Sequence, residues 1–323
     1  MTARVVVTST FLPLQEEAEA AFAGMDVEFV MVQANTPAEL IEAVRGADAV
    51  VSLAEPYTRE VIETMGSVRS ITRFGIGVDN VDVPAATEHG LWVTNVPDGN
   101  YREVAVHAIT LALSVARRIP VIDKSMQETG TATLALAEGT RRPDEQTFGL
   151  LGMGRIGRRV VTMAKAVGYR VVVFDPMVTA ADAAELGAEL LTFDEVVEHS
   201  DILSLHVPYT EANRNMIDAD VIARMRPGSV IVNVSRGGLI DEAALGAAIR
   251  SGHLAGAGID AYVGEPAPLA PDHPLRGLEN VILTPHSAHF SAESIAEIKQ
   301  KALADVARIV RGEKPVYPVN NPA

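Results

Sequence analysis

Short apolar runs alternate with longer segments of helical periodicity along most of the chain. Runs rich in Val and Ile occupy residues 5–8, 27–30, 49–53 and 70–72, and stretches rich in Ala, Glu and Leu separate them. The alternation starts again with runs at residues 147–151, 170–174, 202–205, 230–233, 257–259 and 281–283. Buried strands that alternate with helices are typical of βαβ units and parallel sheets. The sequence therefore predicts an α/β protein with two doubly wound parallel-sheet domains.

A helical stretch lies between the two series of strands. Apolar residues recur at helical spacing over residues 104–116. Residues 127–145 have weak periodicity and many small or polar residues, so we predict a surface excursion there. The last helical pattern, at about residues 292–311, is expected to return to the first domain. These features predict one domain made of residues 1–98 and 292–323 and a second domain made of residues 99–291.

Composition and charge narrow the class of protein. The formal net charge is −15, and clustered Lys and Arg are not found, so we expect no nucleic-acid partner. The absence of cysteine excludes disulfides, thiolate metal sites and a Cys nucleophile. No apolar run approaches the roughly 18 residues of a membrane span, and no signal peptide is evident. We therefore expect a soluble, cytoplasmic protein with no membrane partner. Because no His, Asp and Glu residues have metal-ligand spacing, we also expect no metal.

A glycine-rich motif follows the first strand of the second series. Directly after the run at 147–151, the chain reads Gly152-Met153-Gly154-Arg155-Ile156-Gly157, and a helical pattern comes next. In a dinucleotide-binding fold the first glycine allows a tight turn, the second lets the pyrophosphate approach the backbone, and the third allows close helix packing. The helix N-terminus supplies amide donors to the phosphates. A turn that merely joins strand and helix is the structural alternative.

An acidic residue at the end of the next strand extends this interpretation. Asp175 lies 18 residues after Gly157, close to the separation of about 20 found in dinucleotide-binding folds. Its carboxylate would accept hydrogen bonds from ribose hydroxyls and would repel a 2′-phosphate, and the adjacent Pro176-Met177 supplies no arginine to offset the repulsion. The sequence therefore favours NAD over NADP, although Asp175 could instead only cap a turn before Pro176.

Three further polar motifs each follow a predicted strand. They read Asn233-Val234-Ser235-Arg236-Gly237, Asp260-Ala261-Tyr262-Val263-Gly264-Glu265-Pro266 and Thr284-Pro285-His286-Ser287-Ala288. Ligands bind beyond the carboxyl ends of the strands in open parallel sheets. Hydride transfer at a 2-hydroxy acid needs a cation for the carboxylate and carbonyl, a titrating group for the proton, and an acid that tunes this group. Arg, His and Glu can supply these three functions.

With these motifs the chain resembles the D-2-hydroxyacid dehydrogenases over nearly its full length. The resemblance includes two further segments, residues 73–82, which read Arg-Phe-Gly-Ile-Gly-Val-Asp-Asn-Val-Asp, and residues 201–210, which read Asp-Ile-Leu-Ser-Leu-His-Val-Pro-Tyr-Thr. It implies an NAD-dependent oxidoreductase of the phosphoglycerate dehydrogenase-like kind, in a short form without a regulatory domain. The second domain would be a Rossmann NAD-binding domain and the first would bind substrate. A small 2-hydroxy or 2-keto acid would be the substrate, and the protein would be a homodimer.

The resemblance also implies a role for individual residues. Arg236 would clamp the substrate carboxylate and carbonyl as a planar fork. His286 would be the general acid in reduction and the base in oxidation, and Glu265 would favour its imidazolium form. The amides of Ile76 and Gly77 would bind the carboxylate. Cofactor contacts would come from Gly152, Gly154, Arg155, Ile156, Gly157, Asp175, Val207, Pro208, Thr210, Val234, Ser235, Arg236, Asp260 near the nicotinamide, His286 and Ala288.

Structural alternatives exist for each of these assignments. Arg236 could bridge surface carboxylates, Glu265 could be a solvated loop acid, and His286 could be a core histidine. His206 is interpreted as a packing residue and not as a catalytic one. The remaining histidines outside the motif region are interpreted as surface or helix residues; they are His89, His107, His199, His253 and His273.

Some positions depart from the family pattern and leave the substrate open. The loop at 52–57 reads Ser-Leu-Ala-Glu-Pro-Tyr, where phosphoglycerate-specific members carry an Arg-Ser pair, so a substrate phosphate lacks an evident partner. Two other functions stay open. One is an NAD(H)-sensing corepressor of the same fold, similar to the C-terminal-binding proteins, and the other is a phosphite-type dehydrogenase. A formate dehydrogenase is disfavoured, because those relatives usually have Gln at the position of Glu265.

Overall fold

The computed structural model describes residues 2–265 and 267–322, so Pro266 of the Glu265 motif lies outside the described residues. The chain divides into two compact units. The first comprises Met1–Asn100 and Phe290–Ala323, and the second comprises Tyr101–His289. The boundaries expected from the sequence were 98/99 and 291/292.

The first unit is built on a parallel sheet with the strand order β2-β1-β3-β4-β5. This is the order of one of the two common doubly wound folds. Neighbouring strands pair in direct register, as between Val5 of β1 and Phe29 of β2. The strands are β1 (Ala3–Val7), β2 (Val27–Met31), β3 (Ala49–Ser52), β4 (Ser70–Arg73) and β5 (Trp92–Thr94).

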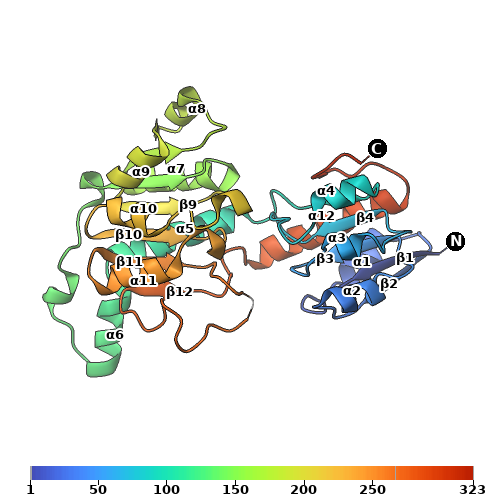
Figure 1. Cartoon of the computed structure of the whole chain (residues 1–323), viewed down its shortest axis with the longest axis horizontal. Coiled ribbons are helices and arrows are strands. Elements are labelled where there is room, and N and C mark those ends of the chain that lie inside the picture. Colours follow the sequence, from blue (N-terminus) through green and yellow to red (C-terminus); the bar gives the residue numbers. More distant parts are fainter. Residues whose placement is uncertain (1, 266, 323) are drawn as a thin grey trace. The chain divides into compact units, whose positions relative to one another are not determined.

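Helices cover both faces of this sheet (Figure 1). The helices of the first unit are α1 (Gln15–Ala21), α2 (Pro37–Ala43), α3 (Arg59–Ile62), α4 (Val83–Glu88) and α12 (Ala292–Val310). One core forms where α2, α3 and α4 pack on one face, and a second core forms where α1 and α12 pack on the other. Helix α12 belongs to the first unit.

The second unit contains a larger parallel sheet with the order β12-β11-β10-β9-β6-β7-β8. Counted from β6, this is the Rossmann order with one additional strand, and the direction of winding switches between β6 and β9. The strands are β6 (Thr147–Leu151), β7 (Arg170–Phe174), β8 (Glu189–Leu190), β9 (Ile202–Leu205), β10 (Ser229–Asn233), β11 (Leu254–Ile259) and β12 (Val281–Leu283). With two parallel-sheet α/β units, the predicted fold class is confirmed.

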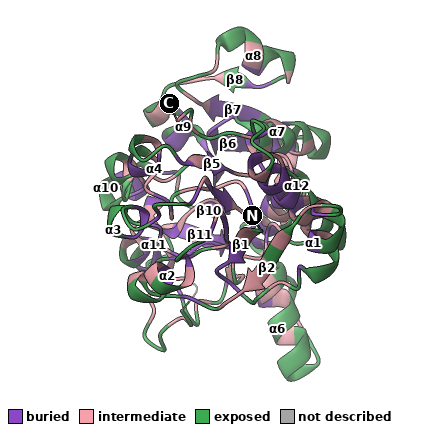
Figure 2. Cartoon of the chain, turned by 90° about the vertical axis from the view of Figure 1, so that its right-hand side faces the viewer, coloured by how far each residue is buried: buried purple, intermediate pink, exposed green. Residues whose placement is uncertain are grey.

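Helices also cover both faces of the second sheet, and Figure 2 shows buried strands and exposed outer helix faces. One core contains α5 and α7, and the opposite core contains α9, α10 and α11. The helices are α5 (Tyr101–Ala116), α6 (Ile119–Thr129), α7 (Arg155–Val167), α8 (Ala180–Glu185), α9 (Phe193–His199), α10 (Ala219–Arg224) and α11 (Glu242–Arg250). Short 3-10 turns are η1 (Leu134–Ala137), η2 (Pro143–Glu145), η3 (Glu211–Asn213) and η4 (Gly237–Leu239).

Local sequence signals start many of these helices. Thr36, Thr179 and Thr192 each begin a helix with a capping box, in which the Thr side chain and the acid three residues later accept each other's backbone amides. Asp218 and Asp241 cap α10 and α11 in the same region of the chain by accepting first-turn amides. Each of these caps marks the residue at which a helix begins, after the loop that precedes it.

The structure also contains elements that the hydrophobic pattern did not predict. The strands β5 (Trp-Val-Thr) and β8 (Glu-Leu) are short and lack a run of Val, Ile or Leu, unlike the equally short β12 (Val-Ile-Leu). Helix α6 starts after Arg118, which adopts a left-handed conformation with φ 55°, and it reaches into the segment predicted as a surface excursion. Val121 is the only buried residue of this helix among those described.

No single helix in the described part of the chain is long and apolar enough to cross a membrane. Helices α5 and α6 reach the required length and composition only when taken together, and they meet at an angle of 65°. The apolar residues of α5, including Ala108, Leu111 and Val115, are buried in the core of the second unit.

Candidate active site

The glycine-rich turn between β6 and α7 brings three backbone segments into close contact. Gly152 has φ +97°, and a Cβ on it would lie 2.5 Å from the carbonyl oxygen of His206, at the end of β9. A Cβ on Gly157 would lie 2.2 Å from the carbonyl oxygen of Gly152. Both positions therefore require glycine for close approach at the switch point of the sheet.

The middle glycine of the motif leaves open space where a ligand can approach. No atom lies within 4 Å of the position that a Cβ on Gly154 would take. Gly154 is the N-cap of α7, no side chain caps this helix, and Arg155 and Ile156 form its first turn. Backbone donors at the start of a 13-residue helix, next to an uncovered glycine, fit a pyrophosphate. The residues present therefore fit a dinucleotide cofactor.

Asp175 follows β7 and lies beside this turn. Its Oδ2 accepts a hydrogen bond from the Met153 amide at 2.7 Å, and its Oδ1 accepts one from the Met177 amide at 2.8 Å. A carboxylate has about four acceptor sites, so both oxygens retain capacity for ribose hydroxyls. Asp175 also borders a hollow of about 370 Å³ whose other lining residues are Phe174, Leu190, Leu191, Thr192 and Glu195.

The segment after β9 contains His206 and three predicted cofactor residues. Nε2 of His206 lies 2.9 Å from the Ser204 hydroxyl, while its Nδ1 is buried without a hydrogen-bond partner among the described residues. Burial lowers the pKa of His206 to about 3, so the ring is neutral at physiological pH. This agrees with its interpretation as a packing residue. Val207 packs against the core, and Pro208 and Thr210 are exposed.

The turn after β10 holds Arg236 through several hydrogen bonds. The Ser235 hydroxyl donates to the Leu205 carbonyl at 2.8 Å, which ties this turn to β9. Asn233 is buried, and its amide nitrogen donates to the Arg236 carbonyl at 2.8 Å. Arg236 donates from Nη1 to the carbonyl of Ser235 at 2.8 Å. Val234 is buried beside it. The backbone that carries the predicted substrate clamp is therefore fixed on both sides.

His286 and Glu265 form a hydrogen-bonded pair in the second unit. Nδ1 of His286 lies 2.7 Å from Oε1 of Glu265, and the side chains are 38% and 20% exposed. An ionised carboxylate only accepts hydrogen bonds, so Nδ1 carries the hydrogen and Nε2 is the nitrogen left to exchange a proton. His286 has a positive φ of 52°, a backbone conformation that is uncommon outside glycine and is often found at functional sites.

Asp260 organises the loop that carries His286. Its buried carboxylate accepts hydrogen bonds from the Thr284 hydroxyl at 2.5 Å and from the amides of Ser287 and Ala288 at 2.9 and 3.0 Å. Nε2 of His107, on α5, lies 3.0 Å from the same Thr284 hydroxyl. The Asp260 carboxylate is thus committed largely to this loop, and its predicted contact with the nicotinamide stays a prediction.

The predicted carboxylate-binding amides lie in the first unit, in the loop after β4. Gly75 adopts φ +127°, and its carbonyl accepts a hydrogen bond from the Val96 amide at 2.9 Å. Asn95 donates from its side chain to the carbonyl of Ile76 at 2.7 Å. Ile76 and Gly77 are half-buried. Their loop is therefore tied to the segment after β5, while its role in binding stays a prediction.

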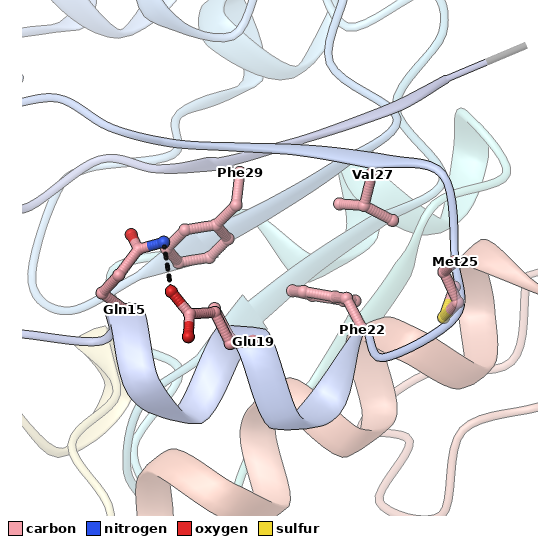
Figure 3. Close-up of a pocket in the computed structure, with 7 residues that line it drawn as sticks. Gln15, Glu19, Phe22, Met25, Val27 and Phe29 are labelled. Carbon is pink, nitrogen blue, oxygen red and sulfur yellow. Dashed lines mark hydrogen bonds between the residues drawn. The ribbon is translucent and has the colours of Figure 1, made fainter.

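A second hollow, of about 240 Å³, lies on the first unit away from these residues. Figure 3 shows Gln15 and Glu19 of α1 at its rim, joined by a hydrogen bond of 3.3 Å, with apolar side chains alongside. The apolar lining residues are Ala18, Phe22, Met25, Val27 and Phe29. None of the residues predicted for the site lines this hollow.

Two of the histidines that were interpreted as surface or helix residues contact other side chains. His107 contacts Thr284, as described above, and His273 pairs with Glu242 at 3.0 Å in a nearly buried position. Glu242 was not singled out in the sequence. Glu242 and His273 are 31 residues apart, so no local spacing could have joined them. Among the described residues, no group of three or more His, Asp or Glu side chains could hold a metal ion.

Comparison with known proteins identifies the family. Residues 109–288 match the model of the D-isomer specific 2-hydroxyacid dehydrogenase, NAD binding domain. The chain belongs to the D-2-hydroxyacid dehydrogenase family. The predicted resemblance is thereby confirmed, and the second unit is an NAD-binding domain of this family, as the turn geometry at Gly152–Gly157 also indicates.

Individual relatives cover most of the chain. It is 40% identical over 289 residues to the D-3-phosphoglycerate dehydrogenase of Mycobacterium tuberculosis. The aligned region covers 89% of this chain and 53% of that protein. It is 37% identical over 285 residues to the glyoxylate reductase of Korarchaeum cryptofilum, with 87% and 85% covered. The structure of a D-lactate dehydrogenase from Escherichia coli without ligands superposes with a TM-score of 0.78 at 30% identity, covering 98% of this chain and all of that one. A Thermus thermophilus protein superposes with a TM-score of 0.87 at 31% identity, with the same coverage. The chain spans about half the length of the phosphoglycerate dehydrogenases that it matches.

Proposed function

We propose that this protein is an NAD-dependent dehydrogenase that interconverts a small D-2-hydroxy acid and its 2-keto acid. The observation that carries this proposal is the His286–Glu265 pair, whose 2.7 Å contact leaves Nε2 of the imidazole available for proton exchange. Arg236 and the Gly152–Gly157 turn also follow strands of the same sheet, and all lie at carboxyl ends, where ligands bind in such sheets.

In this mechanism each residue has one task. A bound nicotinamide supplies or accepts the hydride at C2. In reduction, His286 donates the Nε2 proton to the carbonyl oxygen as it becomes a hydroxyl, and in oxidation the neutral ring accepts that proton. Glu265 favours the charged imidazolium and fixes its orientation. Arg236 holds the carboxylate and the carbonyl oxygen through its planar guanidinium. We assign the amides of Ile76 and Gly77, in the first unit, to the substrate carboxylate.

The cofactor preference that we propose is NAD over NADP. Asp175 places a carboxylate next to the glycine turn, where a ribose 2′-phosphate would be repelled. The remaining assigned contacts come from the segments after β9, β10 and β12, namely Val207, Pro208, Thr210, Val234, Ser235 and Ala288.

We propose that the substrate carries no phosphate group. The loop at 52–57 contains no arginine or lysine, whereas Glu55 places a nearly buried carboxylate there, 7% exposed. Oε2 of Glu55 accepts hydrogen bonds from the Ser52 hydroxyl at 3.0 Å and the Leu53 amide at 2.8 Å. A fixed negative charge at this edge of the first sheet disfavours a dianionic phosphate group nearby.

A spectrophotometric assay tests the proposed reaction. NADH oxidation is followed with glyoxylate, hydroxypyruvate, pyruvate, phosphohydroxypyruvate and bulkier 2-keto acids, and NADPH is run in parallel. We expect turnover with NADH and at least one unphosphorylated keto acid. No turnover with any keto acid, with NADH binding confirmed by fluorescence, would contradict the proposal and would favour phosphite chemistry or a sensing role.

We also propose a homodimer, assembled through the region of α5, α6 and η1. Val106, Ile119, Met126 and Leu134 are exposed there, Leu134 at 92%. Clustered exposed apolar side chains mark interaction surfaces. Light scattering should give twice the chain mass of 34.3 kDa, and Leu134→Asp should give a monomer. A monomeric wild type would contradict the assembly. The expected cytoplasmic location stays a prediction that cell fractionation tests.

A further inference from the structure

A buried carboxylate–imidazole pair contacts the loop that carries Glu265. Glu242, the first residue of α11, places Oε2 3.0 Å from Nε2 of His273, and the two side chains are 9% and 11% exposed. The Leu275 amide donates to Nδ1 of His273 at 3.3 Å. Nδ1 is therefore the acceptor, and Nε2 carries the hydrogen that is donated to Glu242. One tautomer of His273 thus orients Glu242.

The other oxygen of Glu242 binds the backbone of the Glu265 loop. The Val263 amide, two residues before Glu265, donates to Oε1 of Glu242 at 2.9 Å. Burial raises the pKa of Glu242 and the charge of Glu265 adds to this, while hydrogen bonds from Val263 and His273 oppose it. Glu242 fixes the loop through a main-chain contact that any residue at position 263 except proline could make.

The same peptide also packs against the Arg236 turn. A Cβ on Gly237 would lie 2.1 Å from the carbonyl carbon of Tyr262 and 2.4 Å from the Val263 nitrogen, so only glycine allows this approach. The side chain of Asn233 donates to the Arg236 carbonyl at 2.8 Å and to the Ala261 carbonyl at 3.4 Å. The Arg236 turn thus lies against this peptide but is held by Asn233, independently of Glu242.

The carboxylate of Glu265 has few side-chain contacts of its own. Oε1 contacts His286, but Oε2 is buried and has no hydrogen-bond partner in the part of the chain that the structure describes. With a single side-chain partner, the position of this carboxylate depends on the backbone that carries it. That backbone is held by Glu242 two residues earlier.

We propose that Glu242, oriented by His273, is a positioning residue that fixes where Glu265 lies relative to His286. The inference rests on the proposed dehydrogenase function and assigns a further pair of residues to it. A misplacement of about 1 Å, even one caused far from the reacting atoms, can lower turnover by about 100-fold. Loss of the Val263 contact should therefore lower kcat while leaving the NADH site around Gly152–Gly157 unchanged.

A double-mutant cycle between Glu242 and Glu265 tests this proposal. Steady-state NADH oxidation is measured with the fastest 2-keto acid of the panel above for Glu242→Ala, Glu265→Gln and the double variant. We expect Glu242→Ala to lower kcat by about 10- to 100-fold, with an unchanged Kd for NADH by fluorescence. Its pH profile should move in the same direction as that of Glu265→Gln. In the Glu265→Gln background, Glu242→Ala should change kcat by less than about twofold, because residues that act as one unit are not additive.

A rescue variant and a matched control separate positioning from general stability. Glu242→Gln keeps an oxygen for the Val263 amide, and its side-chain nitrogen can donate to the other tautomer of His273, in which Nδ1 no longer accepts from the Leu275 amide. It should recover most of the turnover lost in Glu242→Ala. Asp218→Ala removes the N-cap of α10, where Asp218 accepts the Val221 amide at 2.9 Å. We expect this control to lower the melting temperature without changing kcat or the pH profile.

The outcomes distinguish this proposal from the proposed function. Suppose that wild type oxidises NADH with a 2-keto acid, but the fold-losses of kcat caused by the two substitutions multiply in the double variant. The positioning role is then wrong and the dehydrogenase function stands. If Glu242→Gln loses as much turnover as Glu242→Ala, the contact with Val263 is not what matters, and the proposal is equally overturned. If Glu242→Ala does not fold, His273→Phe, which removes the donor to Glu242, takes its place in the cycle with the same expectations. A wild type inactive with every keto acid refutes both proposals.

Discussion

The two sheets follow the same parallel architecture, but their carboxyl edges hold polar groups in opposite ways. In the second unit, the loops after β10, β11 and β12 carry Arg236, Glu265 and His286, and buried side chains such as Asn233 and Asp260 brace the backbone behind them. In the first unit, the polar side chains at the edge bind one another. Thr8, Ser52 and Glu55 are joined by hydrogen bonds of 3.0 and 3.3 Å, and Thr8 contacts the Tyr57 hydroxyl at 2.7 Å.

The two edges thus differ in whether their polar side chains are buried or are carried on loops. Thr8, Ser52 and Tyr57 are completely buried, and burial raises the pKa of Tyr57 above its ordinary value, so its hydroxyl stays protonated. At this edge of the first unit, these polar side chains therefore bond one another. The second unit offers ionisable side chains. We therefore expect substitutions in the second unit to change chemistry and those in the first to change stability or selectivity.

The largest effect should come from His286. Because its φ is 52°, Asn is the suitable replacement, since Asn tolerates this conformation without a titrating nitrogen. We expect His286→Asn to lower kcat at least about 100-fold, with the melting temperature and the Kd for NADH nearly unchanged. Steady-state NADH oxidation measures the change. Turnover close to wild type would remove His286 from the mechanism.

Removal of the Glu265 charge should have a smaller effect that depends on pH. In the proposed mechanism the carboxylate favours the imidazolium form, so in Glu265→Gln the descending limb of the reductive profile should move to lower pH. kcat against pH in a constant ionic strength buffer measures this limb. A profile in the same place as that of wild type would refute the role of Glu265.

A third substitution tests the cofactor side of the second unit. Asp175→Asn keeps an acceptor for a backbone amide but removes the charge that faces a 2′-phosphate. We expect the ratio of kcat/KM with NADH to kcat/KM with NADPH to fall by about tenfold, which corresponds to about 1.4 kcal/mol. Parallel assays with the two cofactors give this ratio. An unchanged ratio would mean that selectivity lies elsewhere.

The smallest effect is expected in the first unit. Tyr57→Phe removes the hydroxyl that contacts Thr8 at 2.7 Å but keeps the buried ring. It should lower the free energy of unfolding by about 1 kcal/mol, seen as a lower melting temperature, and leave kcat unchanged. A large loss of kcat with unchanged stability would show that the polar cluster of the first unit takes part in chemistry, and the contrast between the two edges would fail.

Much of this molecule is determined by local sequence. Strands such as 147–151, 170–174, 202–205 and 281–283 coincide with β6, β7, β9 and β12 as observed. The runs of β6, β7 and β9 are long enough to be recognised, because a strand buried on both faces needs a continuous apolar run. The sequence also predicted the turn at 152–157 from its glycines. The structure requires them, because Gly152 has φ +97° and a Cβ on Gly152 or Gly157 would collide with a carbonyl oxygen.

Other features were decided only by the tertiary structure. The short strands β5 and β8 exist because neighbouring strands supply the pairing partners. The pairs Glu242–His273 and His107–Thr284 join residues 31 and 177 positions apart. Local patterns cannot carry such contacts, because they arise when the carboxyl ends of strands distant in sequence meet at one edge of a sheet. The sequence by itself thus determined most strands and the glycine turn and predicted the candidate residues Arg236, Glu265 and His286, and the fold decided which buried residues hold their loops.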